Sequence, residues 1–164
     1  PVSWGDFRAA PPGDASSLID VAAIYMTIHW SASYAIRNQG SNWVGTVESL
    51  AVVNAMDPLR SWVLASRESQ QALGHEQTHF NLNEVYRRKI EAALKCQQAT
   101  GPTSASAQST LQQKLHQTAD ALLDRLAEIQ SQYDRETRHG SDAAQQAAWN
   151  QRVLTWLAQP SLAP

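Results

Sequence analysis

The sequence has a single cysteine, Cys96, among 164 residues. An internal disulfide is therefore impossible, and a zinc site built from several cysteines is excluded. There is no excess of basic residues either, because 13 Lys and Arg stand against 15 Asp and Glu, for a formal net charge of -2. We therefore expect no nucleic-acid partner. No apolar run approaches the ~18 residues of a membrane-spanning helix, so no membrane span is expected in this chain.

The composition is that of a packed globule. Hydrophobic residues make up 43% of the chain, and six of them are Trp. This content is too high for a disordered segment, and the length fits one folded unit with a sizeable core. We expect one domain that covers residues 1–164.

The first third of the chain has the pattern of β-strands. From Ile24 to Arg37, apolar and polar residues alternate with a period of two, which predicts a long strand with one buried face. The turn-forming residues "RNQGSN" (37–42) separate it from a second strand at residues 43–56, which we expect to run antiparallel to the first. The segment "SWVLAS" (61–66) predicts either a short third strand or an extended segment.

The rest of the chain has helical patterns. Residues from Ser69 to about Thr100 contain no Pro and predict one long helix, followed by a loop at 100–109. Leucines then recur at helical spacing from Leu111 to Tyr133, and Gly140 is a suitable end for that helix. Ser141 or Asp142 is a suitable start for a last helix. Strands followed by helices indicate the α+β class.

One short motif carries chemistry. In "LGHEQTHFNLNEVYRRK" (73–89), His75 and His79 are four residues apart and project from one face of a helix, so both rings can bind one metal ion. Zinc is the metal that this HExxH spacing indicates. Glu76 lies about 100° around the helix, where it can act as general base on a water molecule activated by the zinc.

The third zinc ligand is not given by the motif. The pattern with a third histidine six residues after the second fails, because that position is Val85. The segment "YDRETRHG" (133–140) holds the strongest candidates. His139, beside a helix-ending glycine, can turn toward a neighbouring helix, and Glu136 falls on an apolar stripe where an unpaired charge is costly. Asp134 in the same segment is a further candidate. Among the others, Asp120, Asp124 and Glu128 fall on a polar face, and His116 lies off the apolar stripe.

Two neighbours of these candidates have possible supporting roles. Tyr133 can donate a hydrogen bond to a developing oxyanion, although a residue of the apolar stripe can equally pack in the core. Asp134 can orient a ligand imidazole from outside the coordination sphere, and Glu136 is a second candidate for such a supporting position.

Three blocks of sequence carry a resemblance to a known family. They are "SWGDFRAAPP" near the start, "HEQTHFNLNEVYRRK" in the middle, and "YDRETRHG" followed by "QQAAWNQRV" near the end. In these blocks the chain resembles a bacterial family of unknown function whose members are considered to be secreted zinc-dependent proteases. The resemblance implies a location in the periplasm or outside the cell. It also favours His139 as the third ligand, because His139 stands where the family has a histidine.

Together these features predict a zincin-like α+β domain, with a small antiparallel sheet packed on the HExxH helix and two C-terminal helices. One Zn²⁺ per chain is expected, bound by His75, His79 and His139, and the substrate is expected to be a peptide or protein. Such a substrate is expected to extend along a sheet edge, within 43–56 or along 61–66. Two alternatives remain: a zinc-binding module of the cell envelope with little catalytic activity, and a structural domain without metal.

Overall fold

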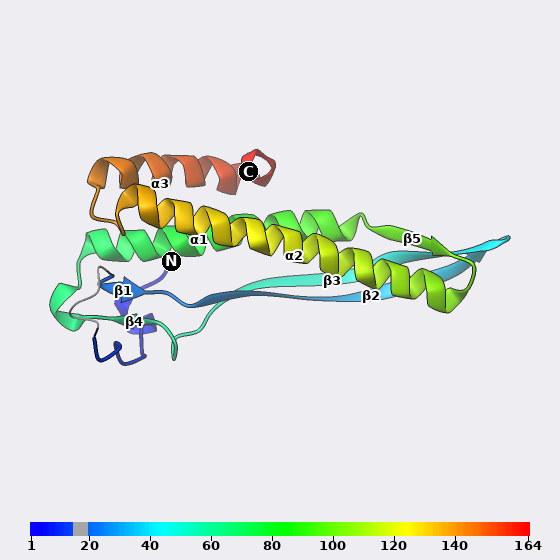
Figure 1. Ribbon diagram of the computed structural model, residues 1–164, viewed down its shortest axis with the longest axis horizontal. Coiled ribbons are helices and arrows are strands. Elements are labelled where there is room, and N and C mark those ends of the chain that lie inside the picture. The colour runs from blue at the N-terminus through cyan, green and yellow to red at the C-terminus, as the bar shows by residue number, and fades with distance from the viewer. Residues whose placement is uncertain (15–19) are drawn as a thin grey trace.

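The computed structural model describes residues 1–14 and 20–164. Three helices lie lengthwise along a long β-hairpin, as Figure 1 shows. The helices are α1 (Gln70–Lys95), α2 (Ser104–Thr137) and α3 (Ala143–Ala158), and the hairpin strands are β2 (Met26–Gln39) and β3 (Asn42–Met56). Helices α1 and α2 pack on the sheet, and α3 lies on their other side. The molecule is therefore α+β, as the sequence predicted.

The main sheet has three antiparallel strands in the order β2-β3-β5, where β5 spans Gln98–Gly101. The hairpin turns at Gly40, whose φ of 71° is readily adopted only by a residue without a side chain. Its register shifts between Ser33 and Tyr34, which marks a β-bulge. A separate two-stranded sheet pairs β1 (Ala22–Ala23) with β4 (Trp62–Val63), and Ala9 adds an isolated bridge to Trp62.

Short 3₁₀ helices complete the fold among the described residues: Trp4–Asp6, Ala65–Arg67 and Pro160–Leu162. The 3₁₀ helix Ala65–Arg67 joins β4 to α1, so only the first part of the segment 61–66 is a strand, as expected there. Among the described residues, no helix is both long and apolar enough to cross a membrane.

The sequence-based prediction for residues 96–109 is wrong. Helix α1 ends at Lys95 instead of near Thr100, and residues 98–101 form β5. The cause is a long-range interaction, since β5 hydrogen-bonds with the start of β3 at Trp43–Thr46 and buries Ala99. The second half of the predicted loop forms the start of α2. This helix begins after Thr103, and the Thr103 side chain accepts a hydrogen bond from the backbone N–H of Ser106.

The core lies between the helices and the inner face of the hairpin. The apolar stripe of α2 is buried, including Leu111 and Leu115, and it faces Ile90 and Leu94 of α1. Further along, Tyr86 and Tyr133 pack with Trp149 and Trp156 of α3, where successive rings meet edge to face. The predicted start of the last helix is confirmed, because the side chain of Asp142 accepts a hydrogen bond from Gln145 N–H.

The packing predicts a contrast between two leucines. Leu111 is fully buried, whereas Leu154 of α3 is 57% exposed. Leu111→Ala is expected to lower the free energy of unfolding by about 2–5 kcal/mol, because it removes buried methyl groups and leaves a cavity. Leu154→Ala, the matched control, is expected to change it by less than about 0.5 kcal/mol. Urea denaturation measures both, and equal losses would contradict this description of the core.

Candidate metal centre

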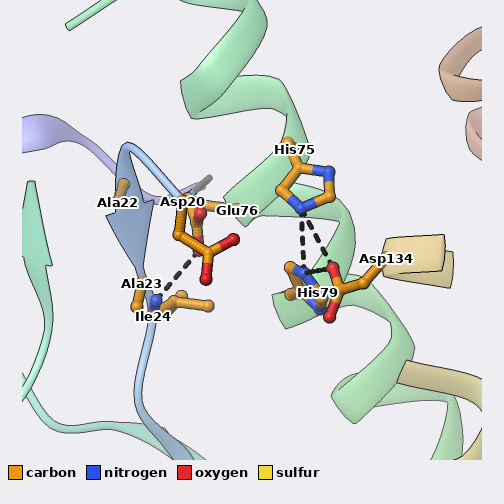
Figure 2. Close-up of a pocket in the computed structure, with 8 residues that line it drawn as sticks. All are labelled: Asp20, Ala22, Ala23, Ile24, His75, Glu76, His79 and Asp134. Carbon is orange, nitrogen blue, oxygen red and sulfur yellow. Dashed lines mark hydrogen bonds and ion pairs between the residues drawn. The ribbon is translucent and has the colours of Figure 1, made fainter. Parts of the chain in front are cut away.

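His75 and His79 lie in the second and third turns of α1, at the end of the molecule where α2 finishes (left in Figure 1). Their rings are one turn apart and largely buried, with side-chain exposures of 7% and 12%. The two Nε2 atoms are 3.1 Å apart. The expectation that both rings face one point from a single helical face is met by the geometry, as Figure 2 shows.

Asp134 of α2 completes this convergence. Its Oδ1 lies 2.8 Å from His79 Nε2 and 3.2 Å from His75 Nε2. Despite these short distances, neither ring presents an N–H in line with this oxygen, so within the described part of the chain the buried Oδ1 has no hydrogen-bond donor. A buried carboxylate oxygen without a donor is costly unless a cation is placed beside it.

The other nitrogen of each ring is held by a glutamine. His75 Nδ1 lies 3.1 Å from Gln146 Oε1, and His79 Nδ1 contacts Gln130 Oε1. The amide group of Gln130 is oriented by a second bond, in which its Nε2 donates to the backbone carbonyl of His79 at 3.1 Å. The oxygen therefore faces Nδ1, and Nδ1 must be the donor. In the neutral rings the lone pair is consequently on Nε2, the atom that faces Asp134.

The charges of this cluster favour a cation at its centre. Burial acts to raise the pKa of Asp134, but contacts with His75 and His79 outweigh it and hold this pKa far below its usual range. Burial acts to lower the pKa of His79, yet Asp134 and Glu76 raise it above its ordinary value. Asp134 is thus a carboxylate at neutral pH and stabilises positive charge beside it, either on an imidazolium or on a metal ion.

Glu76 projects from the same helix toward the N-terminal segment. It is buried, and its Oε2 accepts a hydrogen bond of 2.9 Å from the backbone N–H of Ile24. Burial raises the pKa of Glu76, although His79, His75 and the Ile24 N–H act in the opposite direction. Glu76 lines a cavity of about 160 Å³ together with the three converging residues, Asp20 and Ala22–Ile24. Figure 2 shows it beside this segment.

These residues fit a zinc ion. Two imidazole nitrogens and a carboxylate oxygen are zinc ligands, and tetrahedral coordination separates neighbouring ligand atoms by about 3.3 Å. The three separations here are 2.8, 3.1 and 3.2 Å. The buried oxygen without a donor and the oriented rings supply what a metal site needs: a negative ligand, free lone pairs and fixed supporting contacts. His75, His79 and Asp134 are the group among the described residues that this geometry brings together.

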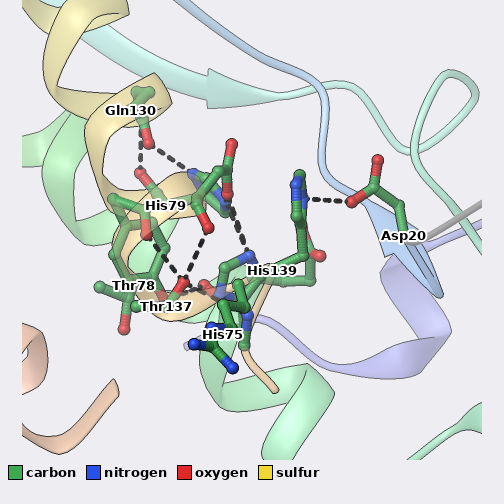
Figure 3. Close-up of polar contacts among 12 residues, drawn as sticks. Asp20, His75, Thr78, His79, Gln130, Thr137 and His139 are labelled. Atoms are coloured by element: carbon green, nitrogen blue, oxygen red, sulfur yellow. Dashed lines mark hydrogen bonds and ion pairs between the residues drawn. The ribbon is translucent and has the colours of Figure 1, made fainter. Parts of the chain in front are cut away.

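His139 does not lie in this group. Helix α2 ends at Thr137, and both Arg138 and His139 adopt left-handed backbone conformations. This turn directs the His139 ring to Asp20, with which its Nδ1 forms an ion pair, as Figure 3 shows. The sequence prediction of His139 as the third ligand thus differs from the geometry, in which Asp134 occupies the position beside both rings. The predicted supporting role of Asp134 outside the coordination sphere also differs from the geometry, because its Oδ1 lies beside both Nε2 atoms.

Glu136 lies away from its expected position beside the ligands, and Tyr133 is packed in the core, the second of the two roles that the sequence left open. Glu136 accepts hydrogen bonds from Gln132 and from Trp149 Nε1, at 2.7 and 2.8 Å, and it touches none of the converging residues. Tyr133 stacks on the His75 ring, and it is fully buried. Its hydroxyl donates to the His75 carbonyl at 3.2 Å and accepts from Gln146 Nε2 at 2.7 Å. It therefore supports the His75 ring from behind and does not line the cavity.

The supporting residues Gln130 and Gln146 were missed in the sequence. A signal was available for Gln130, because it lies four residues before Asp134 and so shares its face of α2. No comparable signal existed for Gln146, since its contact depends on how α3 packs against α1. Burial of a glutamine with both amide atoms bonded became visible only in three dimensions.

The chain belongs to a family known from its sequences. A family model described as "Bacterial protein of unknown function (DUF922)" matches residues 8–140. The match includes the converging residues His75, His79 and Asp134, together with Glu76. No significant match was found among the curated proteins or among the solved structures.

Gly140 provides a test of the centre. A Cβ at this position would lie 3.0 Å from His75 Cβ and Cγ, and its φ of 79° is strained for any other residue. We expect Gly140→Ala to cost about 1–2 kcal/mol of stability from the backbone alone. By displacing His75 it is also expected to weaken zinc binding about 10- to 100-fold, as the loss of a supporting contact does.

Gly40→Ala is the matched control, because Gly40 also has a positive φ but nothing within 4 Å of an added Cβ. It is expected to lose stability without losing zinc affinity. Zinc affinity is measured by competition with a chelator, and unchanged zinc binding in Gly140→Ala would contradict the placement of His75 against Gly140.

Proposed function

We propose that this protein is a zinc-dependent peptide-bond hydrolase with a zincin-like active site. The observation that supports this most strongly is the convergence of His75, His79 and Asp134 in one cavity that Glu76 also lines. Three ligands leave a fourth position for water or substrate, which is the arrangement of catalytic zinc sites. A site that only stabilises a fold would instead be closed by four protein ligands.

Each residue of the site has a defined task in this proposal. His75, His79 and Asp134 hold the zinc ion, and Gln146 and Gln130 fix the orientation of the two rings. A bound zinc ion would lower the pKa of a water molecule and polarise the carbonyl of the scissile bond. Tyr133 packs against the back of His75 and closes that side to solvent.

Glu76 is the proposed general base. One of its oxygens is engaged by Ile24 N–H, and the carboxylate lines the cavity in which water and substrate would meet. The buried environment raises its pKa, which makes the carboxylate a stronger base than an exposed glutamate. It would accept a proton from the attacking water and pass it to the amine that leaves.

The peptide would be held along β1. Val21 carbonyl accepts a hydrogen bond from Leu64 N–H at 2.9 Å, so the alternation of an antiparallel pair directs the backbone groups of Ala22 and Ile24 away from β4. That side borders the cavity, and an extended peptide can add there as a further strand. Of the two segments expected from the sequence, β4 lies between β1 and Ala9, and β3 pairs with β2 along its length and with β5 at Trp43–Thr46.

One observation favours the second candidate, a zinc-binding module without turnover. Glu76 is only 4% exposed, and its bond to Ile24 holds one oxygen in a backbone contact. A glutamate whose task is to anchor the segment 20–24 would have the same surroundings. The two candidates differ in whether the proton-accepting ability of Glu76 matters.

The ligand set gives the first test of the proposal. We expect close to one zinc per chain in elemental analysis, with loss of metal in His79→Ala. Asp134→Ala is expected to weaken zinc binding more than about 100-fold, beyond the effect of losing a supporting residue. His139→Ala is expected to change it by less than about tenfold, because His139 is paired with Asp20.

A purified protein that neither contains nor takes up zinc would refute the metal site as a whole. If His139→Ala proved the damaging change and Asp134→Ala the mild one, the ligand set would instead be the three histidines that the sequence predicted.

The second test separates the enzyme from the binding module. Glu76→Gln keeps the size of the side chain and an acceptor for Ile24 N–H, but it does not accept a proton at neutral pH. Zinc content and thermal stability are expected to stay near the wild-type values. Cleavage of denatured casein, or of a random peptide mixture, is expected to fall by about 10²- to 10⁴-fold, the usual effect of losing a general base.

The matched control is Glu48→Gln, which makes the same chemical change at an exposed position of β3, away from the site. Equal cleavage by the wild type and Glu76→Gln would remove the support for hydrolysis at this site and leave the binding module as the better explanation.

A further inference from the structure

A second cavity, of about 230 Å³, lies directly beside the metal cavity. The two are separated by the ion pair of Asp20 with His139, since Asp20 lines the metal cavity and His139 lines the second one. The segment 20–24 takes part in both, because Asp20 and Ala22–Ile24 line the first cavity and Val21, where the chain bends, lines the second. Gly140, which lies against the ring of His75, is a further member of the shared wall.

The charged lining of the second cavity is cationic. Arg67, at the end of the 3₁₀ helix before α1, and Arg138, which follows α2, both line it. Within residues 1–14 and 20–164, no acidic side chain forms an ion pair with either guanidinium. Asp20, on the wall shared with the metal cavity, is paired with His139. Two exposed arginines from separate elements therefore line one cavity, and neither forms an ion pair with a described residue.

The backbone at Arg138 is held by several interactions, and its side chain is exposed. Its φ of 50° and that of His139, 52°, are left-handed, a conformation that costs about 1–2 kcal/mol per residue without glycine. Hydrogen bonds hold the turn: His139 N–H donates to Asp134 carbonyl at 2.9 Å, and Ser141 Oγ donates to Arg138 carbonyl at 2.7 Å. The turn that carries Arg138 is thus anchored on Asp134, the residue beside both histidine rings.

We propose that this second cavity is a substrate subsite that binds a carboxylate of the peptide, through Arg67 and Arg138, next to the bond that is cleaved. The inference rests on the proposed hydrolase function and adds its substrate class. Guanidinium groups bind carboxylates with paired, charge-assisted hydrogen bonds. A peptide that adds to β1 runs past Val21, where the wall of the second cavity begins. The carboxylate belongs to an Asp or Glu side chain or to the C-terminus of the peptide.

The test reads binding without turnover. Zinc-loaded Glu76→Gln protein is immobilised and exposed to two random hexapeptide libraries, one with free C-termini and one with amidated C-termini. Bound peptides are sequenced by mass spectrometry. Asp and Glu are expected to be enriched at one position of both libraries if a side chain is bound. If the C-terminus is bound, neither library is expected to be enriched in Asp or Glu. The protein is then expected to retain about tenfold more peptide from the library with free C-termini than from the amidated library.

Variants of the arginines decide whether the cavity is responsible. Arg67→Gln with Arg138→Asn removes both charges, and Asn is among the residues that tolerate the left-handed conformation of position 138. The preference is expected to fall about 10- to 100-fold, the effect of losing hydrogen bonds to a charged group. Arg37→Gln, an exposed arginine on the hairpin, is the matched control and is expected to keep the preference. Zinc content and thermal unfolding report whether the double variant folds, and Arg67→Gln alone replaces it if it does not.

A carboxylate preference that is absent, or that persists without the arginines, would overturn the inference. The hydrolase proposal fails separately, through cleavage that does not depend on Glu76. Cleavage that depends on Glu76 without a carboxylate preference would leave the hydrolase and remove the subsite. A preference that depends on the arginines without any cleavage would leave a carboxylate-binding cavity and remove the hydrolase.

Discussion

The contact of Asp134 Oδ1 with the Nε2 atoms of His75 and His79 is the interaction on which the rest of the site depends. It joins the start of α1 to the end of α2 through groups that are costly to bury. A carboxylate without a hydrogen-bond donor and two imidazole nitrogens within 3.2 Å of it require positive charge between them. The same three atoms that stabilise a cation therefore also join the two longest helices at this end, beyond the apolar core that packs them along their length.

The third helix contributes to this site from outside it. Gln146 of α3 accepts from His75 Nδ1 and donates to the Tyr133 hydroxyl, and Tyr133 in turn donates to the His75 carbonyl. Trp149, one turn later, packs edge to face on Tyr133. The packing of α3 is thereby coupled to the orientation of one ring, because a shift of Gln146 would release His75 Nδ1. Helix α3 thus supports the candidate metal centre although it supplies none of the three converging residues.

The parts of the site that follow from local geometry could be predicted from the sequence, and the others could not. His75, Glu76 and His79 were found because residues four apart share one face of any helix. The choice between His139 and Asp134 depended on where α2 ends. The helix continues to Thr137, which keeps Asp134 on the face toward α1, and the left-handed turn after it directs His139 to Asp20. Strand β5 was missed for a related reason, since its four residues are extended only because β3 pairs with them.

The short segment 20–24 takes part in the walls of two cavities. The chain bends at Val21, so Val21 lines the cavity with the two arginines while Asp20 and Ala22–Ile24 line the metal cavity. The backbone of the same stretch engages Glu76 through Ile24 N–H. A peptide paired with β1 would therefore meet the general base and the cationic cavity within a few residues. The position of a carboxylate in that peptide, relative to the bond at the metal, is then set by the period of the strand.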